Sequence, residues 1–313
     1  VHDARKCLKR TRALLRLVRP ALGEREFRSD THRLRDIAQQ LSGARDAHVA
    51  RVTLASLEAL YPLADAGDLE TLRSGLAGED RTDDASSGLS AEVLEKALAA
   101  LGEARDAIGT IEIEGRGFEP LARGLARSFG EFHRALAHIH DGSHDEDFHD
   151  LRKHAQIHWR HMLLLRRAWP EALSLRATLA SALSDRLGDD HDLSVLRAKA
   201  SAIDIEPQLR EALEAAISDR QARLRERALI EARRLALDKP KGLSRRIAGY
   251  WRTARELRAL AAKENAASSQ HAPEPSADTT ADASIAIEVA DGSGRRRSTA
   301  APRRSRRRPS VTA

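Results

Sequence analysis

Apolar side chains recur at every third or fourth position over most of the first 265 residues, which is the period of an amphipathic α-helix. Proline, glycine and short polar residues interrupt this pattern and separate its segments. The segments predicted to be helical are residues 1–18, 29–40, 45–61, 91–105, 118–140, 146–168, 172–187, 191–201, 206–237 and 243–264. Residues 75–90 have the composition of a polar loop, and residues 107–117 that of a glycine-punctuated connection. The pattern therefore predicts an all-α fold.

Composition supports this fold class and narrows the function classes. Of the 313 residues, 41% are apolar but only 3% are aromatic, so the core must consist mainly of Leu, Ala, Val and Ile. A single cysteine, Cys7, excludes an internal disulfide framework and a zinc site made of several cysteines. No apolar run reaches the roughly 18 residues of a membrane span, and no secretory signal is visible. We therefore expect a cytoplasmic protein without a membrane partner.

Residues 266–313 differ in composition from the rest of the chain. They are rich in Ala, Ser, Asp, Thr and Pro, with arginine clusters at 295–297 and 303–308. Such a segment lacks the apolar side chains that offset the entropy of ordering, so we expect a disordered tail. The tail contains 8 Arg and 5 acidic residues, whereas the preceding 265 residues contain 45 basic and 42 acidic residues. Because this body is nearly neutral, an anion site in it requires local segregation of charge.

An internal repeat organises the body. The segment Val1–Lys6 (VHDARK) recurs as Phe148–Lys153 (FHDLRK), and Leu41–Asp46 (LSGARD) recurs as Leu187–Asp192 (LGDDHD). The two pairs have offsets of 147 and 146 residues, so the spacing inside each copy is nearly the same. We therefore predict a duplicated helical unit with pseudo-twofold symmetry.

The repeat sets the expected domain organisation, which is one helical domain over residues 1–265. Its halves are expected at about residues 1–115 and 116–265. The predicted helix 118–140 precedes the second copy of the repeat, but the first copy has no counterpart because the chain begins at the motif. We therefore expect at least one further helix upstream of Val1.

Each repeated helix carries cationic or protonatable side chains of one sign along one face. On a helical wheel they share an arc of about 120°. In the first copy they are His2, Arg5, Lys6, Lys9, Arg12 and Arg16, and in the second they are His149, Arg152, Lys153, Arg160 and Arg167. Like charges one helical turn apart repel each other, and Asp3 is the only acidic residue between Val1 and Gly23. A linear polyanion lying along the stripe explains this arrangement better than a compact ligand does.

These residues and motifs together resemble the CHAD domain, the conserved histidine α-helical domain. The resemblance covers about residues 1–260. It rests on His2-x-x-Arg5-Lys6-x-x-Lys9-Arg10-x-Arg12, Leu34-Arg35-Asp36 and Leu41–Asp46 in the first half, and on His149-x-x-Arg152-Lys153, His158-Trp159-Arg160-His161, Trp169-Pro170 and Leu187–Leu193 in the second. It implies two helical bundles around a basic channel, binding of inorganic polyphosphate, and association with polyphosphate granules. Two positions depart from the family pattern: Gln156 stands where Lys is usual, and Arg160 where Tyr is frequent.

The wheel and the resemblance together give the candidate ligands of polyphosphate. They are His2, Arg5, Lys6, Lys9, Arg12, Arg16, Arg45, His149, Arg152, Lys153, Arg160 and His191. The sequence has no nucleophile held by a base and no glycine-rich phosphate loop before a helix. We therefore expect a binding protein rather than an enzyme, with no cofactor.

Two other functions fit parts of the same sequence. His154, His158 and His161 share one face of the second repeated helix, and with the Asp189-Asp190 and His191-Asp192 pairs they supply ligand types of an HD-type metal phosphohydrolase. The arginine clusters of the tail bind any polyanion through counterion release, which makes nucleic acid a second candidate partner. Against sequence-specific recognition, few aromatic residues are interleaved with these clusters.

Overall fold

The computed structural model describes residues 2–41, 45–63, 67, 69–78 and 91–270, and within these it leaves out the side chains of residues 2, 45–47, 78 and 267–270. The helices are α1 (His2–Leu22), α2 (Glu24–Gln40), α3 (Arg45–Glu58), α4 (Leu69–Gly78), α5 (Ala91–Gly109), α6 (Glu119–His138), α7 (Asp145–Leu165), α8 (Pro170–Ala200), α9 (Pro207–Leu235) and α10 (Pro240–Gln270), with a 3₁₀ turn at Arg166–Ala168. No β-strand occurs in the described ranges. The all-α prediction is confirmed.

Several predicted boundaries were wrong, and tertiary packing explains the largest error. The predicted helices 172–187 and 191–201 form one continuous helix, α8, although Gly188 lies between them. Gly188 is buried, and the guanidinium of Arg152 from α7 lies against it. Asp190 in the same turn is held by Arg225 of α9. These contacts outweigh the low helix propensity of glycine. Another helix, α4, begins at Leu69 and extends into the predicted polar loop.

Contacts divide the chain into a compact unit, Val1–Asn265, and a second unit that begins at Ala266. The last turn of α10 runs to Gln270, so the first five residues of the predicted disordered tail are helical. The rest of that tail, residues 271–313, lies outside the described residues. Among the helices that are described, none has both the length and the apolar character needed to cross a lipid bilayer.

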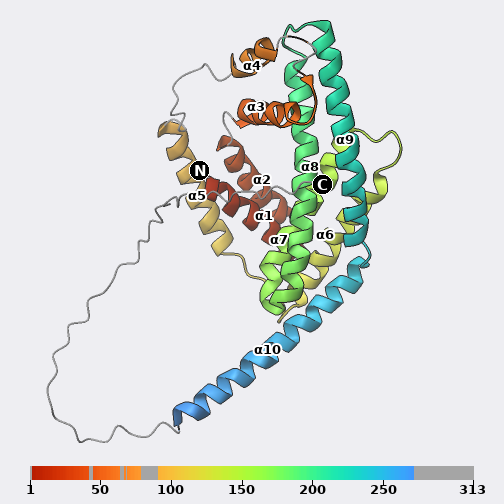
Figure 1. Ribbon diagram of the computed structural model, residues 1–313. Coiled ribbons are helices and arrows are strands. Elements are labelled where there is room, and N and C mark those ends of the chain that lie inside the picture. The colour runs from red at the N-terminus through yellow and green to blue at the C-terminus, as the bar shows by residue number, and fades with distance from the viewer. Residues whose placement is uncertain (1, 42–44, 64–66, 68, 79–90, 271–313) are drawn as a thin grey trace, which may run out of the picture. The chain divides into compact units, whose positions relative to one another are not determined.

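Three groups of buried side chains hold the first unit together. The largest group joins α6, α7, α8, α9 and α10 with Leu17 of α1, and a smaller one joins α1, α2 and α5. The third group packs α3 and α4 against the end of α8 and the start of α9, which lie side by side in Figure 1. This third group takes residues from both predicted halves of the chain. The two halves therefore share a core, while the duplication itself stays a prediction.

The first repeated helix, α1, packs against both α6 and α7. Helix α6 approaches α1 so closely that a Cβ atom added at Gly124 would overlap the backbone of Leu17. On the α7 side, His161 Nε2 lies 2.9 Å from the carbonyl oxygen of Ala13. Because a carbonyl only accepts hydrogen bonds, this nitrogen carries the proton. These contacts fix α1 beside α7, the second repeated helix.

Candidate functional site

Arginine side chains from three helices gather where α1 meets α7. We call this group the arginine cluster, and its members are Arg10, Arg12 and Arg16 of α1, Arg35 of α2 and Arg160 of α7. Burial, together with repulsion from Arg10 and Arg12, lowers the pKa of Arg160 to about 10. Burial and then Arg35 lower the pKa of Arg12. Both guanidinium groups remain protonated at neutral pH, so each is a partly desolvated positive charge.

The charges of this cluster are only partly compensated within the described residues, where Arg35 has Asp36 at 3.6 Å. The Nε atom of Arg12 is buried without a hydrogen-bond partner there. Arg160 donates to the carbonyl oxygen of Gln156 at 3.0 Å, and its guanidinium lies 4.9 Å from the ring centroid of Trp159. The negative charge of Glu131 of α6 acts on Arg16 and partly offsets its positive charge. An unpaired, half-buried guanidinium is costly, which favours an anionic ligand at this position.

A second cationic group lies near the start of α7. We call it the histidine cluster, and it consists of His149, Arg152 and Lys153 of α7 with His191 of α8. The ring centroids of His149 and His191 are 4.2 Å apart. Lys153 Nζ lies 2.9 Å from a carboxylate oxygen of Glu146, an exposed pair that contributes little to stability.

The histidine cluster also contains buried donors without partners. Burial first, and then the nearby His191, Lys153 and Arg152, lower the pKa of His149 to about 4, while Glu146 opposes them. Within the described part of the chain, neither the Nδ1 atom of His149 nor the Nε atom of Arg152 has a hydrogen-bond partner. Here too the donors outnumber the acceptors that the protein supplies.

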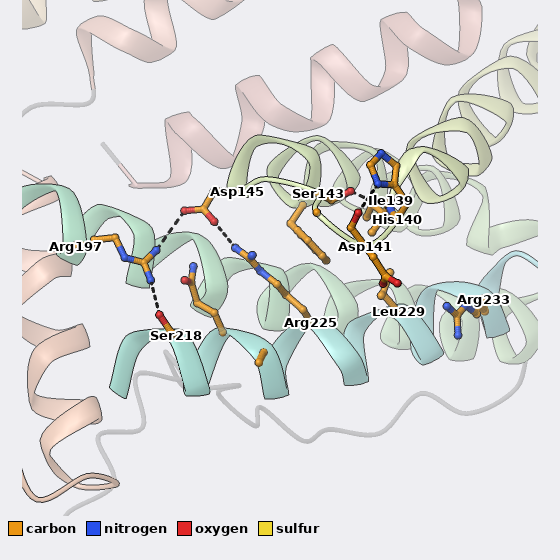
Figure 2. A pocket seen from close by; sticks show the side chains of 14 residues that line it. Ile139, His140, Asp141, Ser143, Asp145, Arg197, Ser218, Arg225, Leu229 and Arg233 are labelled. Carbon is orange, nitrogen blue, oxygen red and sulfur yellow. Dashed lines mark hydrogen bonds and ion pairs between the residues drawn. The ribbon is translucent and has the colours of Figure 1, made fainter. Parts of the chain in front are cut away.

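A polar junction beside α7 holds the histidine cluster in place. Figure 2 shows Asp145, the first residue of α7, between Arg197 of α8 and Arg225 of α9. Asp145 accepts hydrogen bonds from Arg225 at 2.5 Å and from Ser194 at 2.6 Å. Arg225 also binds the buried Asp190 at 2.6 Å, next to His191. This network connects α7, α8 and α9 and thereby fixes the two histidines relative to each other.

The pocket at this junction, about 510 Å³ in volume, is a weaker candidate for an anion site. Arg197 and Arg225 both line it, but each already has a carboxylate partner. Asp141 and Asp145 add negative charge to the same wall. Exposed Arg233 also lines the pocket, but an anion that reached Arg197 or Arg225 would have to displace these carboxylates, so we assign the junction a structural role.

Helix α7 connects the two clusters. His149 and Arg160 are eleven residues apart, which is about three helical turns and about 16 Å along the axis. They lie on the same face because eleven residues bring the helix back to nearly the same direction. Gln156 lies between them and carries no charge. The result is one half-buried face of α7 with a cationic cluster near each end.

The structure brings seven of the twelve candidate ligands into these clusters. They are Arg12, Arg16 and Arg160 in the arginine cluster, and His149, Arg152, Lys153 and His191 in the histidine cluster. Sequence analysis did not select Arg10 or Arg35 as ligands. Both stand within the motifs quoted above, but only the tertiary fold shows that they adjoin Arg160 and Arg12.

The other five candidates lie on α1 and α3. Arg5 is half-buried and Lys9 is exposed, and each has a partner. Lys6 is exposed, with Asp3 at 4.0 Å. His2 and Arg45 belong to α1 and α3, but their side chains lie outside the described residues. The predicted channel between two halves also stays a prediction.

The three histidines considered as metal ligands have protein contacts instead. His158 is buried and accepts a hydrogen bond from Arg176 at 2.9 Å. His161 is bound to Ala13 as described above, and His154 Nε2 is 3.6 Å from Asp150. Within the ranges that the structure describes, no group of three His, Cys, Asp or Glu side chains is arranged to hold a metal ion. The arginine-rich tail segments 295–297 and 303–308, proposed as contacts to nucleic acid, lie outside those ranges.

Comparison with known proteins agrees with the motif analysis. The family model of the CHAD domain matches residues 1–201, from α1 through the first residue after α8. The match ends before α9, so the extension of the resemblance to residue 260 stays a prediction. No curated protein and no solved structure gives a significant match. The family match covers well over half of the chain and includes both repeated motifs, and the chain therefore belongs to the CHAD domain family.

Proposed function

We propose that this protein binds inorganic polyphosphate along the cationic face of α7 and does not hydrolyse it. The family is associated with polyphosphate binding. The observation that carries the proposal is the set of buried nitrogen atoms without a hydrogen-bond partner in both clusters: Arg12 Nε, Arg152 Nε and His149 Nδ1. Phosphate oxygens are strong acceptors that match guanidinium donors in both charge and geometry.

The spacing of the clusters supports a linear ligand. They are separated by about 16 Å along α7, with uncharged Gln156 between them. A compact phosphate ester can contact one cluster only, whereas a polymer with a charge on every unit can contact both. Simultaneous contact makes the second binding step intramolecular and raises affinity by a factor of about 10² to 10⁴.

The chemistry of the clusters supports binding without turnover. Their members are guanidinium, ammonium and imidazole groups, which donate hydrogen bonds and neutralise charge. Hydrolysis also requires an activated water or another nucleophile beside a general base. Glu146, the carboxylate whose charge acts on His149, is engaged by Lys153.

The same proposal includes a location in the cell and a second contact with polyphosphate, made by the tail. We place it in the cytoplasm at polyphosphate granules. The arginine-rich residues 295–308 add electrostatic attraction to polyphosphate, and to nucleic acid as a weaker partner. Deletion of residues 271–313 is then expected to lower the affinity and leave binding intact.

The experiment that tests the proposal is a titration with polyphosphate of defined length at several salt concentrations, with duplex DNA as competitor. The logarithm of the affinity should fall with the logarithm of salt by about 0.7 per phosphate neutralised, by analogy with single-stranded nucleic acid. Polyphosphate should resist competition by DNA, and its chain length should not change during incubation. Equal affinity for DNA, or shortening of the chains, would overturn the proposal.

A further inference from the structure

The imidazole rings of His149 and His191 lie next to each other in the histidine cluster, and protein shields them partly from solvent. The centroids of His149 and His191 are 4.2 Å apart with an angle of 39° between the ring planes. Both side chains are half-buried. His149 Nδ1 is buried and has no hydrogen-bond partner among the described residues. Protein therefore shields part of the pair from solvent, and a partner for one ring nitrogen is missing from the described residues.

The charged groups around the pair come from two helices. From α7 these are Glu146, Arg152 and Lys153, and from α8 the buried Asp190. The negative charge of Asp190 is already directed to Arg225, and that of Glu146 to Lys153. Arg45 on α3 is also a candidate ligand, but its side chain lies outside the described residues. With Lys153 offset by Glu146 and Asp190 offset by Arg225, these ion pairs leave the positive charge of Arg152 beside the two imidazoles.

We propose that the His149–His191 pair takes up a proton when polyphosphate binds, so that the histidine cluster strengthens as the pH falls. This inference rests on the proposed function and describes its regulation. A bound phosphate chain supplies the negative charge that the cluster lacks. A protonated imidazole then becomes a second charged donor to the chain instead of a source of repulsion.

The free protein holds His149 neutral for physical reasons that the ligand reverses. Burial and the neighbouring His191, Lys153 and Arg152 place its pKa at about 4. A polyanion beside the ring stabilises the charged form and raises this pKa in the complex. Between the pKa of the complex and about 4, each fall of one pH unit increases the affinity by up to tenfold for one proton taken up. Below about 4 the free protein is protonated as well, and the gain ends.

The test is calorimetric titration of the full chain with long-chain polyphosphate at pH 6 in two buffers that differ in ionisation enthalpy. Interior phosphates of long chains stay fully ionised at this pH, so the ligand contributes few protons. The difference in observed heat gives the number of protons taken up, which we expect to approach one per bound site. The same titrations at pH 6 and pH 8 should show a stronger affinity at pH 6.

Three single variants locate the proton. His149→Gln should remove most of the uptake and of the pH dependence. His191→Gln removes a neighbour that disfavours protonation of His149, so it should leave much of the uptake in place. His140→Gln is the matched control, because His140 is exposed in the α6–α7 connection and also has a histidine neighbour, His138, with ring centroids 6.3 Å apart. The control should take up the same number of protons as the unmodified chain.

Outcomes of this test separate the inference from the function on which it rests. Binding with no proton uptake, or with the same uptake in all three variants, would overturn the inference alone. Absence of binding at every pH would overturn the proposed function and the inference with it. If a variant fails to fold, NMR titration of the His149 ring in the unmodified chain decides the question. A pKa that is equal with and without polyphosphate would overturn the inference.

Discussion

The arginine cluster and the histidine cluster each include side chains from the same face of α7, but they differ in how the repulsion between their cationic groups is relieved. In the arginine cluster, Arg12 and Arg160 cannot lose their protons near neutral pH, so their repulsion persists in the free protein. In the histidine cluster, His149 stays neutral and so avoids part of that cost. The comparison indicates that one cluster has a fixed charge and the other a charge that depends on ligand and pH.

The clusters also differ in what holds them in position. The histidine cluster depends on the ionic junction of Asp145, Asp190 and Arg225, which connects three helices. The arginine cluster depends on close backbone packing, because Gly124 lets α6 support α1 beside α7. Substitutions can therefore change the charge of a cluster without changing its support, or change its support without changing its charge.

Charge reversal should have the largest effect on binding. We expect Arg12→Glu with Arg160→Glu, and Arg152→Glu with Lys153→Glu, each to weaken polyphosphate binding at least 100-fold, or about 2.7 kcal/mol. The physical reason is that each double variant replaces two attractive charges by two repulsive ones. The fold should persist, since reversal relieves repulsion among neighbouring cations. Calorimetric titration measures the affinity, and circular dichroism monitors the helices.

A control of equal charge change separates this effect from bulk electrostatics. Arg233 and Arg234 are exposed neighbours near the end of α9 and belong to neither cluster. Arg233→Glu with Arg234→Glu should change the affinity only a few-fold. Equal losses in the control and in the cluster variants would show that net charge alone governs binding.

Loss of the support under the arginine cluster should have the largest effect on stability. Gly124→Ala introduces a Cβ atom that overlaps the backbone of Leu17, and backbone cannot move away as a flexible side chain can. We expect a loss of about 3 kcal/mol in the free energy of unfolding, at the upper end for overpacking. Urea denaturation at pH 7 measures it. Gly102→Ala, where the added Cβ meets nothing within 4 Å, should not be destabilising.

A buried imidazole next to the arginine cluster should affect stability rather than binding. Burial lowers the pKa of His161 to about 4, although its hydrogen bond to Ala13 opposes the shift. Since the unfolded chain binds this proton at about pH 6.5, stability present above pH 6.5 is lost as the pH falls toward 4. We expect His161 to account for about 2 kcal/mol of the loss between pH 6.5 and 5.

His161→Gln tests this assignment because glutamine can still donate to the Ala13 carbonyl but does not titrate. The variant should lose less stability than the unmodified chain between pH 6.5 and 5 in urea denaturation without ligand. His138→Gln, at an exposed position, should retain the full loss. An unchanged pH profile in His161→Gln would assign the loss to other groups, with His149 and His158 as the next candidates.

Local patterns predicted most of the helices, because apolar periodicity reports which side of a helix is buried, but they missed α4. They did not predict that α8 continues through Gly188, since that depends on Arg152 and Arg225 from other helices. Nor could they predict that Arg35 adjoins Arg12. The histidines at 158 and 161 look like ligands in the sequence, and only their contacts with Arg176 and Ala13 distinguish a structural role.

The smallest predicted effect separates helix stability from ligand binding at one position. At Gly188 an added Cβ would lie 3.1 Å from Nη2 of Arg152, so Gly188→Ala should displace that guanidinium, which can move because it ends a flexible side chain. Polyphosphate affinity should fall several-fold, while better helix propensity should stabilise α8 by up to about 1 kcal/mol. Gly249→Ala in α10, with nothing near the added Cβ, should change stability at most and leave affinity unchanged. Because the two effects of Gly188→Ala have opposite signs, a variant that is both more stable and a weaker binder shows that glycine is there for the position of Arg152. Unchanged affinity would instead show that the guanidinium of Arg152 does not have to lie against α8 to contact the ligand.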